Sequence, residues 1–196
     1  MKSRYRYGKP IPDRLHTLED PGQPLAFDAD RGLITEVSER CDVKSLVAGL
    51  KGKGPEESEA DMRAFGQRLM AATIELADGK YIDRAGEVIE KVAQQTGIFF
   101  PHSLQRYVEL SIIGSRPLDR WNITKATTKE LVLEVFSCSV LREMQEAGLE
   151  AGELPCHVLC LSSFEAAAQK IGDGVEMEVL KSLPQDGVCQ FSFQHA

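Results

Sequence analysis

The spacing of apolar residues predicts three amphipathic helices in the region that begins at Pro55. From there to Ala77, apolar side chains recur every three or four positions, which is the period of one helix face. Proline in the first turn, followed by acidic residues, is typical of a helix start. The same period predicts further helices from about 81 to 95 and from Pro101 to Gly114.

After this helical region the apolar pattern alternates with a period of two, which predicts strands. Residues 121–124 and 130–136 read as two strands joined by a polar turn. In the second of these, Leu131, Leu133 and Val135 fall on one face. The remaining pattern predicts helices at 139–147 and 157–171, then a closing hairpin made of 175–183 and 188–193.

This order of elements predicts an α+β fold, in which an N-terminal helical subregion is followed by an antiparallel sheet of two hairpins flanked by helices. We expect one such domain over residues 59–196. Residues 1–58 read as an irregular arm, because four of the nine prolines precede residue 25 and proline favours extended structure. Within it, a short strand or turn is expected around 26–36 and a brief helix at 44–54. We expect the arm to pack on the domain or on a second copy of the chain, which would make the protein a homo-oligomer.

Length and charge exclude several classes of protein. The chain has 196 residues, 42% hydrophobic, and a net charge of −7, as expected for one globular domain. The last sixty residues hold nine acidic and three basic side chains, so nucleic acid is not an expected partner. No apolar run is long enough for a membrane helix, so no membrane partner is expected. The basic start lacks an apolar signal segment, and a cytoplasmic location is expected.

The five cysteines are the candidate chemistry of the chain. An odd number without a secretion signal argues against a disulfide framework. Cys138 follows a strand, Cys156 opens a helix and Cys189 lies in the last strand. Because such supports are rigid, these three thiols are expected to meet at one site. Cys160 and Cys41 are expected to stay apart from it.

Two kinds of chemistry and one structural role remain open for these thiols. A helix N-terminus lowers the pKa of a thiol, so Cys156 or Cys138 could act as a nucleophile with His157 as the nearest base. Alternatively, Cys138, Cys156 and Cys189 could bind zinc or another thiophilic metal, with His157 as a further ligand. Free cysteine also serves as a small apolar core residue.

The last sixty residues carry a family resemblance. A strand ending at Cys138 is followed by a helix ending at Gly148, the Leu-Pro-Cys-His sequence at 154–157, and the closing segment SLPQDGVCQFSF at 182–193. This arrangement resembles the L-2-amino-thiazoline-4-carboxylic acid hydrolase-like proteins and their uncharacterised relatives. It is more distantly similar to the vinyl-reductase-like small-molecule-binding domains. The resemblance covers 60–196 in layout and 120–194 in motif, and it implies this fold with a cysteine-lined site.

Two functions follow as hypotheses, and the sequence leaves enzyme status open. The first is a hydrolase that cleaves a C–N bond, other than a peptide bond, in a small heterocyclic or amino-acid-like substrate at the cysteine site. The second is a non-catalytic domain that senses or carries a small molecule or a metal ion. The apolar residues Val158, Leu159 and Leu161 around Cys156 and Cys160 favour binding.

Overall fold

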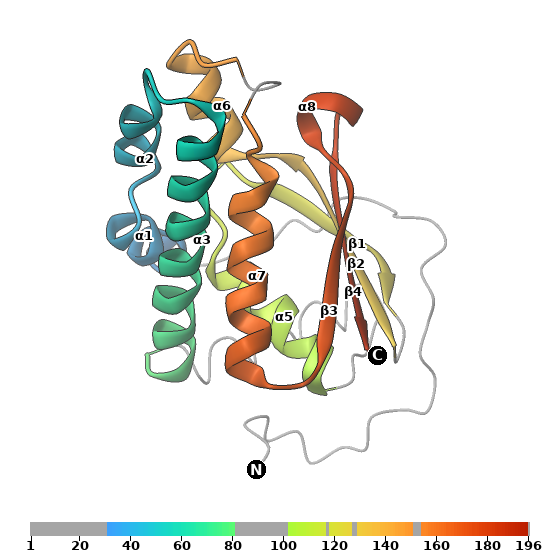
Figure 1. Cartoon of the computed structure of the whole chain (residues 1–196). Coiled ribbons are helices and arrows are strands. Elements are labelled where there is room, and N and C mark those ends of the chain that lie inside the picture. The colour runs from blue at the N-terminus through green and yellow to red at the C-terminus, as the bar shows by residue number, and fades with distance from the viewer. Residues whose placement is uncertain (1–30, 81–101, 117, 127–128, 151–153, 196) are drawn as a thin grey trace.

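The computed structural model describes residues 31–80, 102–116, 118–126, 129–150 and 154–195. They form an α+β fold in which helices cover a four-stranded antiparallel sheet (Figure 1), as the apolar periodicity predicted. In the described part of the chain, no helix is both long and apolar enough to span a membrane. The helices are α1 (Arg31–Arg40), α2 (Val43–Leu50), α3 (Pro55–Asp78), α5 (His102–Ile113), α6 (Ser139–Glu146), α7 (His157–Ile171) and the short α8 (Leu183–Asp186). The strands are β1 (Arg120–Ala126), β2 (Glu130–Ser137), β3 (Val175–Lys181) and β4 (Cys189–His195).

The region predicted to be an irregular arm contains two helices: α2 corresponds to the brief helix expected at 44–54, whereas α1 begins within the segment expected to be a strand or turn. Helices α1 and α2 pack on α3 and bury Val37, Val47 and Leu50 in the core. The Asp42 carboxylate caps α2 by accepting the backbone N–H groups of Lys44 and Ser45. The proline-rich composition that suggested an arm ends before this stretch. Residues 1–30 and the helix expected at 81–95 lie outside the described residues.

The two hairpins form one sheet in the order β1-β2-β4-β3. The central contact pairs β2 with β4, and Val135 lies opposite Cys189 in that register. Helix α8 forms the connection between β3 and β4. Because of this pairing, the end of β2, which leads into Cys138, lies beside the start of β4, which begins with Cys189.

Helices α3 and α7 lie side by side on one face of the sheet (Figure 1), and apolar side chains fill the space between these layers. The inward residues of β2 include Leu131 and Leu133, as the alternating pattern predicted. Phe164 of α7 meets Phe193 of β4 edge-on, with ring centroids 4.8 Å apart. These aromatic contacts fix α7 over the centre of the sheet.

Candidate functional site

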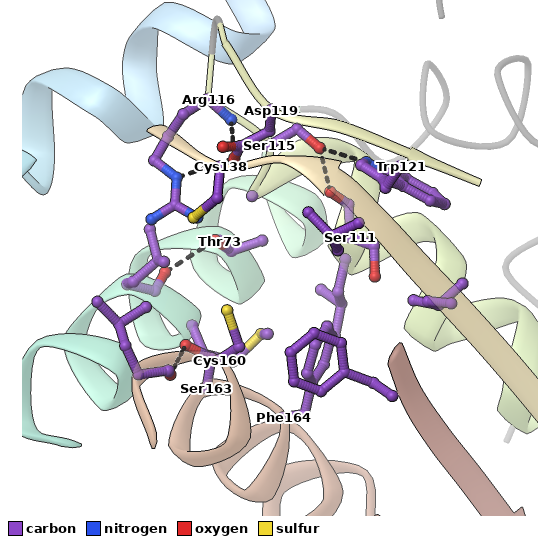
Figure 2. Close-up of a pocket in the computed structure, with 18 residues that line it drawn as sticks. Thr73, Ser111, Ser115, Arg116, Asp119, Trp121, Cys138, Cys160, Ser163 and Phe164 are labelled. Atoms are coloured by element: carbon purple, nitrogen blue, oxygen red, sulfur yellow. Dashed lines mark hydrogen bonds and ion pairs between the residues drawn. The ribbon is translucent and has the colours of Figure 1, made fainter. Parts of the chain in front are cut away.

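A cavity of about 90 Å³ lies between the helical layer and the sheet. Helices α3, α5 and α7, strands β1, β2 and β4, and the segment that joins α5 to β1 all contribute to its wall. Most of the lining side chains are apolar, among them Leu69, Met70, Leu110, Val135, Phe164 and Phe191. Figure 2 shows the cavity with Phe164 and Cys160 on the α7 side and Arg116 and Asp119 on the side opposite.

The hydroxyl groups in the wall donate hydrogen bonds to backbone carbonyl groups of neighbouring residues. Thr73 donates to the carbonyl of Leu69 at 2.8 Å. The remaining hydroxyls do the same: Ser111 donates to Tyr107, Ser115 to Ser111, and Ser163 to Gly66 and Leu159, at 2.7–2.9 Å. The Trp121 indole N–H donates to the Ser115 hydroxyl at 2.9 Å. The wall is therefore less polar than its composition suggests, because these hydroxyl donors are already engaged.

A buried ion pair forms the polar end of the cavity. The Arg116 Nε donates to Asp119 Oδ2 at 2.9 Å, and the two side chains are only 9% and 8% exposed. The other carboxylate oxygen of Asp119 accepts the backbone N–H of Ser139 at 2.7 Å, at the first turn of α6. Asp119 thus ties the segment before β1 to the N-terminus of α6. Burial alone would lower the pKa of Arg116, but Asp119 raises it and keeps the guanidinium charged.

One nitrogen of that guanidinium has no hydrogen-bond partner. The Arg116 Nη1 is buried and unpaired, although Arg116 lines the cavity. In Figure 2 the guanidinium extends from the Asp119 side of the cavity toward the sulfur of Cys138. A buried donor without an acceptor costs about 1–3 kcal/mol. The position of this donor in a cavity wall therefore indicates where an acceptor atom of a ligand can bind.

The cysteines divide differently from the sequence prediction. Cys138, the residue before α6, and Cys160, in the first turns of α7, both line the cavity. Cys156 and Cys189 are buried and do not line it. The thiol charges of Cys138, Cys189 and Cys156 all act on the pKa of Cys160. Cys160 therefore shares the cavity wall with Cys138, and the convergence of Cys138, Cys156 and Cys189 stays a prediction.

Burial decides how these thiols ionise. It raises the pKa of Cys156 to about 12, and the backbone N–H groups at the start of α7 lower it by less. The expectation that the helix terminus makes Cys156 a low-pKa thiol is therefore wrong. Burial also raises the pKa values of Cys138, Cys160 and Cys189. His157 is half-buried at the start of α7 and does not line the cavity.

The sequence predicted that Cys138, Cys156 and Cys189 bind a metal ion. Among the described residues, no group of three or more His, Cys, Asp or Glu side chains is arranged to hold a metal ion. Zinc binding needs sulfurs at about 2.3 Å from one centre. Metal binding by these three residues stays a prediction, and no chemical step is derived from it.

The sequence analysis missed the polar end of the cavity. Arg116 and Asp119 lie in a short segment between a helix and a strand, where charged residues are usually solvated. A signal was present in their spacing, because an Asp three residues after an Arg can fold back onto that Arg and its backbone. Here the Asp119 carboxylate accepts the Arg116 backbone N–H as well as its side chain.

The raised thiol pKa values predict a stability change at alkaline pH. The unfolded Cys156 thiol ionises near its ordinary pKa of about 8.5, whereas the folded thiol ionises near 12. The unfolded state therefore loses its proton first, so the free energy of unfolding is unaffected below about pH 8 and falls as the pH rises toward 12. We expect a steeper fall between pH 8 and 10 for the reduced wild type than for Cys156→Ala in urea unfolding. Parallel curves for the two proteins would contradict this assignment.

No family model, no curated protein and no solved structure matches the chain.

Proposed function

We propose that this protein binds a small, largely apolar molecule in the cavity between α3, α5, α7 and the sheet. The observation that carries this proposal is an apolar cavity whose hydroxyl donors are engaged elsewhere. Binding sites for small molecules are typically concave and apolar, with few convergent polar groups. The Arg116–Asp119 pair supplies that polar element at one end.

The size of the cavity limits the ligand. A water molecule takes about 30 Å³ in the liquid, and an apolar cavity of about 150 Å³ admits benzene. A cavity of about 90 Å³ therefore suits a molecule smaller than benzene, or the end of a larger one that reaches in from solvent. Ligands of that size bind weakly on their own, so dissociation constants in the millimolar range are expected for small probes.

Hydrolysis is less well supported than binding. Nucleophilic attack requires a thiolate, and burial raises the pKa values of Cys138 and Cys160, the two thiols in the cavity wall. Both are therefore neutral near pH 7. The resemblance to a hydrolase-like family supports a cysteine-lined site, which binding and catalysis share. A hydrolytic activity through Cys138, Cys156 and His157 stays a prediction.

Filling the cavity tests the proposal. Val135 of β2 lines the cavity, and Val135→Phe should occupy much of its volume. Val179 of β3 is a half-buried strand valine that packs on the core elsewhere, so Val179→Phe is the matched control. We expect saturable chemical-shift changes on titration with small apolar probes such as cyclopropane for wild type and Val179→Phe. Their affinity should fall at least ten-fold in Val135→Phe. Equal binding by both variants would place any ligand elsewhere.

A further inference from the structure

We propose that the ligand is electrically neutral and carries one hydrogen-bond acceptor, a ketone-type carbonyl oxygen, which takes the N–H of Arg116 Nη1. This inference rests on the proposed function and names the class of ligand for the same cavity. It follows from three properties of the wall: its unpaired donor, its charge and its engaged hydroxyls.

The unpaired donor defines what the ligand must offer. Arg116 is buried, its Nε is used by Asp119, and its Nη1 has no partner. The hydroxyls of Thr73, Ser111, Ser115 and Ser163 already donate to carbonyls. Within the described part of the wall, the donor left for a ligand is therefore the Arg116 guanidinium. An acceptor oxygen placed there removes the penalty of a buried, unsatisfied N–H.

The charge of the wall argues against an anion. Arg116 and Asp119 neutralise one another at 2.9 Å, and a thiol is neutral near pH 7 at its ordinary pKa of about 8.5. The remaining lining residues carry no charged side chain. A ligand carboxylate would place a second negative charge beside Asp119 with one guanidinium to share, which is a costly burial. A ketone satisfies Nη1 and adds no charge.

A matched series of probes separates acceptor from charge. The compounds acetone, acetate and 2-methylpropene are smaller than benzene and have the same branched skeleton and the same number of non-hydrogen atoms. They differ in presenting a neutral carbonyl, a carboxylate and a CH₂ group at the same position. We expect NMR titration of the wild-type protein at pH 7 to give the tightest binding for the ketone. The expected preference is about ten-fold over the alkene, which leaves the donor unpaired, and more over the carboxylate.

The outcomes distinguish this inference from the proposed function. If the alkene binds as tightly as the ketone, the cavity takes apolar molecules but Arg116 does not select them, and the inference fails alone. If acetate binds most tightly, the site is an anion site and the inference is also wrong. If no compound shifts the cavity resonances, both the inference and the proposed function fail.

A variant assigns the preference to Arg116. Arg116→Lys keeps the positive charge for Asp119 but replaces the three guanidinium nitrogens with one ammonium nitrogen, so the donor at the Nη1 position is lost and the ketone should lose most of its advantage over the alkene. Arg142→Lys is the control, because Arg142 lies at the surface on α6 and pairs with Glu146. A ketone preference that survives in folded Arg116→Lys would overturn the assignment. The wild-type series tests the proposal even if that variant is unstable.

Discussion

Gly66→Ala should destabilise the protein by about 3 kcal/mol, at the upper end of what overpacking in a core costs. Gly66 lies where α3 crosses α7. A Cβ atom added there would come within 2.2 Å of both the Leu159 carbonyl oxygen and the Ser162 hydroxyl. The Leu159 oxygen is backbone, and Ser163 additionally donates to the Gly66 carbonyl at 2.9 Å. The helices must therefore separate, and the free energy of unfolding measured in urea should fall.

The same substitution on another helix should have the opposite effect. Gly49 lies in α2 and is exposed, and a Cβ atom there would meet nothing within 4 Å. Alanine is favoured over glycine in helices by up to about 1 kcal/mol, so Gly49→Ala should leave stability unchanged or raise it. A Gly66→Ala protein as stable as Gly49→Ala would show that α3 and α7 do not approach this closely.

Arg116→Met should cost about 3–5 kcal/mol, which is the usual effect of removing one partner of a buried ion pair. Methionine can fill much of the arginine volume but leaves the Asp119 carboxylate, 8% exposed, without its counter-ion. That carboxylate also accepts the Ser139 backbone N–H, so strain there reaches the start of α6. Urea unfolding should show the loss, and adding Asp119→Asn to Arg116→Met should recover part of it.

The surface pair on α6 provides the control for this prediction. Arg142 and Glu146 pair at 3.0 Å with side chains 59% and 58% exposed, and such pairs contribute at most about 1 kcal/mol. Arg142→Met should therefore change stability little. If Arg116→Met were equally mild, the Arg116–Asp119 pair would not be the buried element on which the candidate site depends.

Local pattern was sufficient for most of the fold. The helical period starting at Pro55 and the alternation through Leu131, Leu133 and Val135 each correspond to an observed element with the expected inward face. These elements follow from burial along one face, which is visible in the sequence. Of the two helices at 31–50, α1 was missed because its segment was interpreted from the proline-rich composition of the preceding residues. Their stability comes largely from packing Val37 and Leu50 against the rest of the core.

The site was harder to predict because it depends on contacts between distant segments. Sequence position drew attention to Cys156 as the thiol of a helix terminus, whereas its ionisation is dominated by burial. Burial depends on how α7 packs against the sheet, and spacing along the chain does not reveal it. For the same reason Arg116 and Asp119 went unnoticed. Their importance arises from lying in a cavity wall, where charges that are ordinary in solvent become the main polar feature.

The central claim is that a small, apolar, ligand-accessible cavity exists between α3, α5, α7 and the sheet. Xenon enters such cavities without requiring any polar contact, so it tests the cavity independently of the ligand's chemistry. Methyl NMR spectra of the protein under increasing xenon pressure should show saturable shifts centred on methyl-bearing residues of the wall such as Leu69, Leu110 and Val135. The shifts should be absent in Val135→Phe and retained in Val179→Phe. Shifts centred instead on the exposed Leu180, or no saturable shift at all, would contradict the account.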